Sequence, residues 1–277
     1  MPKLSISTTG IINSSQGNFD AREDLLAVEE PLEIRLTFGD LIRKEMPLMV
    51  TMRTPGNDFD LVRGFLISES VISTNEDILR ISYCKNVIED ELGNVVRVEL
   101  QPSLVFDSKK LQRNFYTSSS CGVCGKSSIE SVINHCQPIL SKVKVGQEQI
   151  VKAPEKLREA QRVFNHTGGL HAAGLFADTG ELLLMREDVG RHIAFDKRTG
   201  AMFERGMKVA GHFILVSGRT SFELVQKCVM VGVPILAGVG APSSLAVKLA
   251  IEANLTLLGF VKSDSFNIYS RAERIVN

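Results

Sequence analysis

Two cysteines in one short loop are the residues of this sequence best suited to chemistry. The segment TSSSCGVCGKSSIE places Cys121 and Cys124 in a C-x-x-C motif, with a glycine after each cysteine. Ser127 and Glu130 fit a capping box, which predicts a helix that begins just after the motif. The positive end of that helix dipole, together with Lys126, favours a thiolate over a thiol. The loop therefore predicts a nucleophilic cysteine.

The motif alone fits a zinc knuckle, a disulfide oxidoreductase, a sulfur carrier or chance. A zinc site needs four ligands, and the nearest further candidates, His135 and Cys136, are adjacent in a helix-like stretch. Adjacent helical side chains point about 100° apart, so one metal does not easily reach both. An oxidoreductase motif belongs in a βαβ unit, whereas this one follows a β-rich region. Cys84, Cys136 and Cys228 are expected to be small buried side chains.

Two loops further along the chain resemble phosphate-binding turns. Each leads through small residues from an expected strand into an expected helix, which presents backbone N–H groups to an anion. Ordinary helix capping explains either loop taken alone. The candidate binding residues in these loops are Ser217, Gly218, Arg219, Thr220, Gly240 and Ser243.

His192 lies in a third group, the charged stretch REDVGRHIAFDK. Such dense charge between a strand and a helix fits a ligand site, and it fits a solvated helix start equally well. His171, in NHTGGLHAAG, is interpreted either as a hydrogen-bonded core histidine or as a ligand.

The elements that must position these residues fall into three parts. Residues 1–30 are polar and end in an acidic run, which suggests a flexible N-terminal arm. Residues 31–145 read as a small α+β domain that carries the cysteine loop at 117–126. In residues 146–277, apolar strands alternate with helical patterns, which predicts an α/β sheet covered on both faces. The expected strands are 32–38, 48–53, 95–100, 172–177, 181–187, 212–217, 233–238 and 255–261, and the expected helices are 60–69, 191–204, 221–231 and 242–253; residues 145–161 are interpreted as a charged linker-like run.

Composition narrows the class of protein further. The 32 basic and 32 acidic residues give a net charge of zero, which argues against general nucleic-acid binding. The first 113 residues carry a net −5 and the remainder a net +5. The longest apolar stretch falls short of the ~18 residues of a membrane span, and the N-terminus lacks the features of a secretory signal. We therefore expect a cytoplasmic protein with reduced cysteines and no membrane contact.

Several long motifs in one order resemble the formate dehydrogenase accessory family FdhD/NarQ. They are MRTPGNDFDLVRGFLISE, SSSCGVCG, HTGGLHAAGLF, REDVGRHIAFDK, SGRTSFELVQK and GVPILAGVGAPSSLAVKLA. The resemblance implies a sulfurtransferase that accepts sulfur from a cysteine desulfurase as a persulfide. It also implies transfer of that sulfur to the molybdenum cofactor of formate dehydrogenase, a bis(molybdopterin guanine dinucleotide) that the protein binds.

The resemblance also assigns residues and a fold. It places the persulfide on Cys121 and implies a later domain that is a three-layer α/β/α unit similar to cytidine deaminases. We expect Cys124 to assist the transfer or to resolve an oxidised state. The family's cofactor-binding stretch falls on Phe260, Val261, Lys262, Ser263, Asp264 and Ser265. At Lys262 we expect most members of the family to have an arginine.

Two other interpretations stay open, and a third is disfavoured. A zinc deaminase is disfavoured, because no His or Cys is followed by Glu two places on. A non-catalytic chaperone that shelters the cofactor, and a zinc-stabilised nucleotide-binding protein, both fit the same sequence. We expect no bound structural metal, and a homodimer is compatible with every interpretation.

Overall fold

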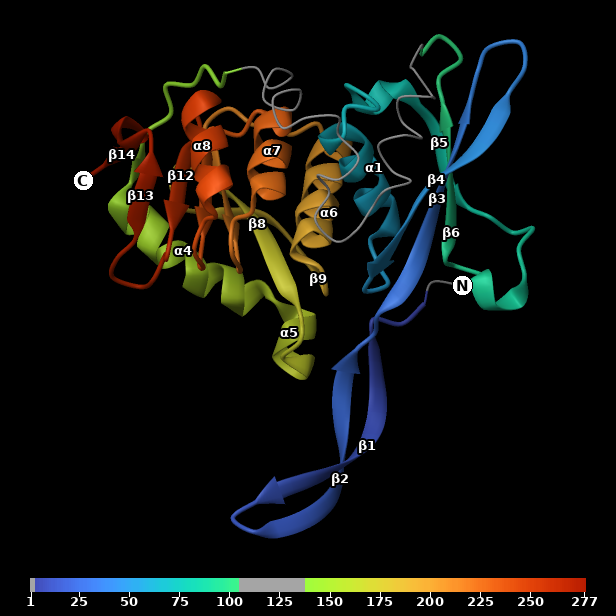
Figure 1. Cartoon of the computed structure of the whole chain (residues 1–277), viewed down its shortest axis with the longest axis horizontal. Helices are drawn as coiled ribbons and strands as arrows, with labels where there is room; N and C mark the ends of the chain where they lie inside the picture. Colours follow the sequence, from blue (N-terminus) through green and yellow to red (C-terminus); the bar gives the residue numbers. More distant parts are fainter. Residues whose placement is uncertain (1–2, 105–137) are drawn as a thin grey trace.

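A β-hairpin forms the N-terminal part of the chain in this computed structural model, which describes residues 3–104 and 138–277. Strands β1 (Ile6–Ser15) and β2 (Asn18–Ala27) pair antiparallel along their whole length and project from the rest of the molecule (Figure 1). Gln16 and Gly17 both have positive φ, as a two-residue turn between twisted strands requires. The polar composition of this segment suggested an arm and did not reveal its strands.

A four-stranded sheet follows, with strand order β4-β3-β6-β5. Its buried face is apolar at alternate positions, such as Leu32, Ile34 and Leu36 of β3. The strands expected at 32–38, 48–53 and 95–100 are confirmed. The elements of this part are β3 (Glu30–Phe38), β4 (Lys44–Arg53), α1 (Asp58–Ser68), η1 (Asn75–Asp77), β5 (Ile78–Tyr83), η2 (Glu89–Glu91) and β6 (Val95–Leu100).

The C-terminal part is built on a six-stranded mixed sheet of order β13-β12-β11-β10-β8-β9. Strands β10, β11 and β12 are parallel, and β8, β9 and β13 pair antiparallel with their neighbours. The five strands expected from the sequence in this part are confirmed. The strands are β8 (His171–Ala177), β9 (Leu182–Asp188), β10 (His212–Val216), β11 (Ile235–Gly238), β12 (Thr256–Gly259) and β13 (Asn267–Ser270), with a separate pair β7 (Val145–Gly146) and β14 (Ile275–Val276) after η3 (Ala272–Arg274).

Helices cover both faces of this sheet, as expected. Along β10, Ile214 and Val216 belong to the core shared with α6 (Arg191–Glu204), α7 (Phe222–Val231) and α8 (Ser244–Glu252). Phe213 and Leu215 point to the other face and pack with α4 (Gln147–Ala160). A short helix, α5 (Arg162–Thr167), follows α4 (Figure 1). None of the helices in the described ranges is long and apolar enough to cross a membrane.

The interpretation of residues 145–161 as a linker-like run is wrong. Most of this segment is α4, whose Ile150, Ala153 and Leu157 are fully buried against the sheet. These three positions form a narrow apolar stripe at helical spacing, and the remaining residues are mostly charged or polar. Pro154 lies inside the helix, and a proline is normally a signal against a helix interior.

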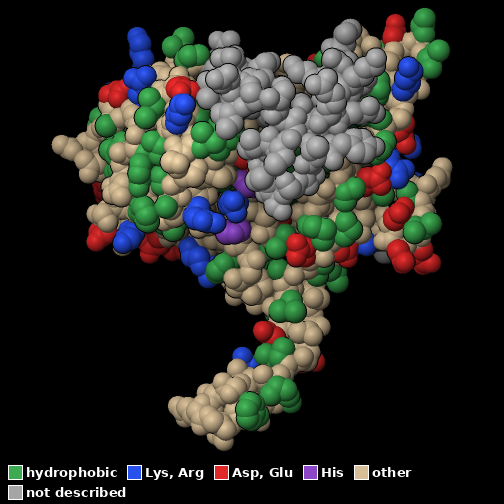
Figure 2. Space-filling view, viewed as in Figure 1, with side chains coloured by type: hydrophobic (Ala, Val, Ile, Leu, Met, Phe, Trp, Pro, Cys, Tyr) green, Lys and Arg blue, Asp and Glu red, His purple; other side chains and the backbone are tan. Residues whose placement is uncertain are grey.

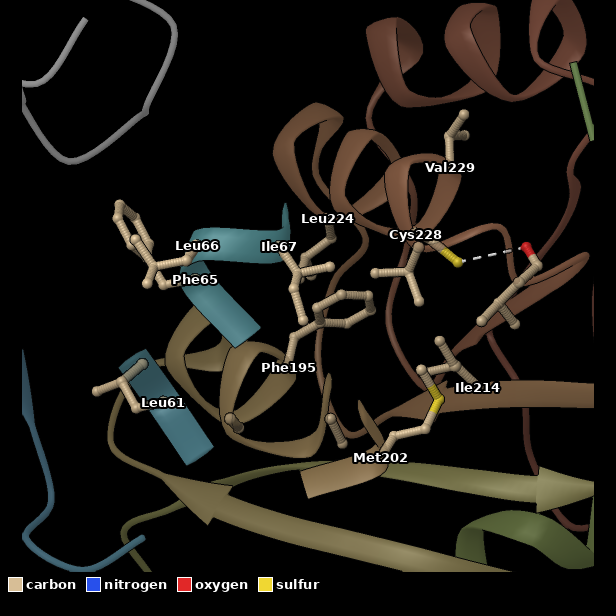
Figure 3. Close-up of a cluster of buried hydrophobic side chains, with 14 of the residues drawn as sticks. Leu61, Phe65, Leu66, Ile67, Phe195, Met202, Ile214, Leu224, Cys228 and Val229 are labelled. Carbon is tan, nitrogen blue, oxygen red and sulfur yellow. Dashed lines mark hydrogen bonds between the residues drawn. The ribbon is translucent and has the colours of Figure 1, made fainter. Parts of the chain in front are cut away.

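Helix α1 of the N-terminal part packs directly on α6 of the C-terminal part. The two helices cross at Gly64 and Gly200, where an added Cβ on either residue would lie 1.8 Å from a backbone oxygen of the other helix. Around this crossing, Phe65 and Ile67 of α1 join Phe195 and neighbouring residues of α6 and α7 in one apolar cluster (Figure 3). The two parts of the chain therefore share a core.

Candidate functional site

The cysteine loop at 117–126, with Cys121 and Cys124, lies outside the described residues, and so does Cys136. Cys84 and Cys228 are buried free cysteines, as expected. Burial raises the pKa of the Cys228 thiol to about 12, so this sulfur is not a nucleophile at neutral pH. Its Sγ instead donates a weak hydrogen bond to the Val233 carbonyl oxygen (Figure 3).

The loops that follow β10, β11 and β12 come together at the carboxyl edge of the parallel strands. Gly240 N–H donates to the Gly218 carbonyl over 3.0 Å, and Phe260 N–H donates to the Gly240 carbonyl over 3.1 Å. Thr220 N–H donates to the Ala241 carbonyl in the same network of backbone hydrogen bonds. Ligands of open α/β sheets bind at this edge. The two loops that the sequence singled out and the stretch that the resemblance assigned to the cofactor thus lie at one edge.

Close packing explains the glycine at position 240. A Cβ on Gly240 would lie 3.0 Å from the backbone nitrogen of Arg219, tighter than ordinary contact. Thr220 is fully buried beneath these loops, whereas Arg219 is exposed. Arg219 therefore lies at the surface of this edge.

Serine side chains cap the two helices that leave this edge. Ser221 Oγ accepts from Leu224 N–H of α7, and Ser243 Oγ accepts from Ala246 N–H of α8. These hydrogen bonds are ordinary helix capping, which the sequence analysis gave as the alternative to phosphate binding. The hydroxyl of Ser243 already has a structural partner, so a ligand contact would share it.

His192, in the first turn of α6, faces the same loops. Its Nε2 lies 2.9 Å from Ser221 Oγ and 3.5 Å from a carboxylate oxygen of Glu223. Burial, followed by the positive charges of Arg191 and Lys227, lowers the pKa of His192 to about 3. The imidazole is neutral at physiological pH and is held in place as a hydrogen-bonding group.

His171 and Arg191 complete this edge, although the sequence left their roles open. His171 begins β8, the antiparallel neighbour of β10, so strand pairing brings its Nδ1 to 3.5 Å from Ser217 Oγ. Burial, with Arg191 nearby, lowers the pKa of His171. Gly218 lies against both, since its Cβ would be 3.4 Å from the His171 ring and 3.9 Å from Arg191 Cδ.

The stretch from Phe260 to Ser265 forms the outer side of the same edge. Val261 is buried and its N–H donates to Gly238 O, which fixes the start of the stretch to β11. Phe260 has a φ of 53° and is 43% exposed, an unusual backbone and an unusual exposure for an aromatic residue. Lys262, Ser263, Asp264 and Ser265 are exposed. On the face that Figure 2 draws, Lys, Arg and His side chains gather near the centre of the molecule.

A buried ion pair fixes the start of α6. The Asp188 carboxylate accepts from Lys197 Nζ at 2.6 Å and from the Gly190 and Thr54 N–H groups. Burial is the largest influence on Asp188 and raises its pKa, while Lys197 opposes that rise. These contacts orient the turn from which Arg191 and His192 extend.

Within residues 3–104 and 138–277, no group of three or more His, Cys, Asp or Glu side chains is placed to hold a metal ion. The site is instead an edge of backbone amides, neutral imidazoles and arginines. Such a set suits an anionic ligand with hydrogen-bonding groups.

Comparison with known proteins identifies the family. The FdhD/NarQ family model matches residues 27–276. "Sulfur carrier protein FdhD" of Streptomyces coelicolor is 47% identical over 271 residues, covering 96% of this chain and 94% of that protein. The protein of the same name from Sulfurisphaera tokodaii is 42% identical over 257 residues, covering 92% of each chain.

A solved structure has the same fold. The crystal structure of a putative formate dehydrogenase accessory protein from Desulfotalea psychrophila superimposes with a TM-score of 0.76 at 20% identity, covering 99% of this chain and 100% of that one. The family match and the identities of the relatives together establish that this chain belongs to the FdhD/NarQ family.

Proposed function

We propose that this chain is a sulfurtransferase that carries sulfur to the molybdenum cofactor of a formate dehydrogenase. The observation that carries the proposal is the 47% identity, over 96% of the chain, to a protein named as a sulfur carrier. The crystal structure titled as a putative formate dehydrogenase accessory protein supports formate dehydrogenase as the client.

In the proposed first step, the Cys121 thiolate attacks the outer sulfur of a persulfide on a cysteine desulfurase. A new S–S bond forms on Cys121 as the old one breaks, and the desulfurase cysteine leaves as a thiolate. In the second step, the Cys124 thiolate attacks Cys121 Sγ, and sulfide leaves toward the molybdenum. The two cysteines are then joined as a disulfide, which a cellular dithiol reduces before the next cycle.

The carboxyl edge of β10, β11 and β12 is the proposed binding site for the dinucleotide part of the cofactor. Arg191 Nε and Thr220 Oγ1 are buried there, and neither has a hydrogen-bond partner among the described residues. Phosphate oxygens satisfy such donors, and Arg219 and Lys262 add positive charge at the surface. These features support the assignment of residues 217–220, Gly240, Ser243, His192 and 260–265 to cofactor binding.

The proposal divides the work between two parts of a cytosolic protein. Residues 31–145 carry the nucleophile, and residues 146–277 form a rigid, cytidine-deaminase-like platform for the cofactor. The mixed sheet with helices on both faces supports such a platform. The sequence lacks the deaminase motif, so the platform binds a nucleotide-like ligand without that chemistry.

Replacement of Cys121 tests the proposal in cells that lack their own copy of the protein. Cys121→Ala should abolish formate dehydrogenase activity, while the purified variant still binds the guanine dinucleotide cofactor. Cys84→Ala, which removes a buried cysteine, is the matched control and should keep both properties. Full dehydrogenase activity with Cys121→Ala would instead support a chaperone that does not carry sulfur.

A further inference from the structure

A cavity of about 380 Å³ lies in the N-terminal part of the chain, at one edge of the four-stranded sheet. Strand β5 is the last strand at this edge, and among the described strands it pairs only with β6. The connection from β5 to β6, which contains η2, extends away from the rest of the molecule (Figure 1). The cavity is lined by Phe59, residues 80–85, Leu92 and Gly93.

The cavity follows the edge of β5 itself. Side chains alternate between the two faces of a strand, so Arg80 and Ser82 lie on one face of the sheet and Ile81 and Tyr83 lie on the other. All four residues line the cavity. Residues from both faces can line one cavity only where it runs along the side of the strand that points away from β6.

The backbone of β5 presents hydrogen-bonding groups to this cavity. Cys84 N–H donates to Val95 O of β6 over 2.9 Å, which fixes the register of the antiparallel pair. In such a pair, alternate residues turn their backbone groups toward the partner strand. Ile81 and Tyr83 are out of step with Cys84, so their N–H and C=O groups point away from β6. Within residues 3–104 and 138–277, no second strand pairs with them, and such an edge is a template for another chain.

Two aromatic rings give the cavity a rigid apolar wall. The ring centres of Phe59 and Tyr83 are 4.9 Å apart, and their planes are tilted by 40°. Tyr83 OH donates to Asp58 Oδ2 over 3.0 Å, and the buried Arg53 donates to both oxygens of the same carboxylate. Leu92 extends the wall and is 41% exposed. An apolar side chain of a ligand can pack on this wall without first ordering it.

The charged residues that line the cavity, Arg80 and Lys85, are both basic. Both side chains are exposed, and no described residue forms an ion pair with either of them. Helix η2 carries three acidic residues (Glu89–Glu91), but none of them lines the cavity. The cavity therefore complements acidic side chains of a ligand.

Charge also decides between a second copy of this chain and a different partner. If two β5 strands paired antiparallel along the cavity, Arg80 of one copy would come close to Lys85 of the other. Like charges opposite each other destabilise a sheet, and basic side chains on an edge strand oppose this kind of self-pairing. An acidic strand from another protein has no such penalty.

We propose that the edge of β5 binds an extended, acidic segment of a partner protein as an added strand. Ile81 and Tyr83 supply the main-chain hydrogen bonds, as in other complexes formed by strand addition. Alternate side chains of the segment then point to opposite faces of the sheet. Apolar side chains pack on Phe59 and Tyr83, and acidic side chains meet Arg80 and Lys85. The expected partner sequence therefore alternates apolar and acidic residues.

Binding of a defined peptide to the full-length protein tests the proposal. The probe is a fluorescent eight-residue peptide in which glutamate and valine alternate, and fluorescence anisotropy measures its affinity. Arg80→Glu combined with Lys85→Glu should weaken binding at least tenfold, whereas a peptide of alternating lysine and valine should bind this variant better than the wild type. Arg22→Glu combined with Lys208→Glu makes the same change of net charge at exposed positions elsewhere and should leave both affinities unchanged.

Methylation of the peptide backbone separates strand addition from binding by side chains alone. One peptide carries N-methyl groups on its four valine amides and another on its four glutamate amides, so that each has one edge that cannot pair. At least one of them should bind the wild type tenfold more weakly than the unmethylated peptide. Hydrogen exchange should slow at the Ile81 and Tyr83 amides when the unmethylated peptide is bound. Neither measurement needs a variant, so misfolding cannot explain the result.

Three results would overturn the proposal. The first is failure of the glutamate–valine peptide to bind the wild type, and the second is equal affinity for all three peptides. The third is a wild-type dimer that becomes a monomer with Arg80→Glu and Lys85→Glu in sedimentation, because a second copy would then occupy the edge. None of these results depends on whether Cys121 carries sulfur.

Discussion

His192 shows at the scale of one residue how burial prepares a binding group. Its imidazole lies within hydrogen-bond distance of Ser221 and close to two positive side chains, so the neutral form is favoured. A neutral ring can donate or accept a hydrogen bond without adding charge. The positive charge of the edge then comes from its arginine and lysine side chains.

The depressed pKa of His192 predicts a pH-dependent stability. The unfolded side chain titrates near 6.5 and the folded one near 3, so the unfolded state binds more protons between these values. The contribution of His192 is fully present above pH 6.5 and is lost as pH falls toward 3. At pH 5 the loss is up to about 2 kcal/mol.

Urea unfolding at pH 7.5 and pH 5 measures this effect. His192→Asn should reduce the difference in unfolding free energy between the two pH values, because asparagine does not titrate. His166→Asn replaces an exposed histidine and should keep the wild-type difference. An equal pH dependence in wild type and His192→Asn would contradict the assigned pKa.

At the scale of elements, two glycines set how closely α1 and α6 approach. Neither Gly64 nor Gly200 has space for a Cβ, because the facing backbone occupies it. The close crossing brings the apolar residues of α1 onto α6 and α7, which joins the two parts of the chain in one core. The short distance between the two helices requires glycine at both Gly64 and Gly200.

Gly200→Ala should therefore lower the free energy of unfolding by about 3 kcal/mol or more, since the added methyl group forces two backbones apart. Equilibrium unfolding in urea measures the change. Gly10→Ala is the matched control, because Gly10 of β1 has open space around it, and it should change stability little. A small effect of Gly200→Ala would mean that the helices do not cross this closely.

The sequence predicted most elements but not all of their roles. The bounds expected for the strand 95–100 and the helix 191–204 match the structure. Helix α4 was missed because only three of its fourteen residues are buried, which leaves a mainly charged sequence.

Tertiary contacts explain why the site itself was only partly predictable. Small residues after β10 and β11 indicated the loops, and parallel pairing placed them at one edge. The position of His171 depends on the antiparallel register of β8 against β10, which local patterns do not encode. The sequence alone therefore could not decide whether His171 is a core histidine or a ligand.

At the scale of the whole molecule, buried charges connect the N-terminal and C-terminal parts. Lys197 bonds to Asp188 and to the Thr54 carbonyl, and Asp196 is paired with Lys227 and accepts from Ser68. Each pair is buried, so loss of one partner leaves an unpaired charge in the interior. These contacts hold the two parts in one relative orientation.

Lys197→Met should lower the free energy of unfolding by about 3–5 kcal/mol, because Asp188 stays buried without its cation. Adding Asp188→Asn should recover part of that loss, since the uncompensated charge is removed. Lys152→Met, at an exposed pair with Glu148, should have little effect. Urea unfolding of the four proteins distinguishes a buried pair from a surface pair, and equal effects of Lys197→Met and Lys152→Met would contradict this account.

Sulfur carriage by Cys121 is the central claim, and one measurement tests it most directly. The purified protein is incubated with a cysteine desulfurase and cysteine, and its peptides are mapped by mass spectrometry without reductant. The account predicts one added sulfur atom on Cys121, and none on Cys84 or Cys228, which are buried. An unmodified Cys121, under conditions in which the desulfurase itself carries a persulfide, would contradict it.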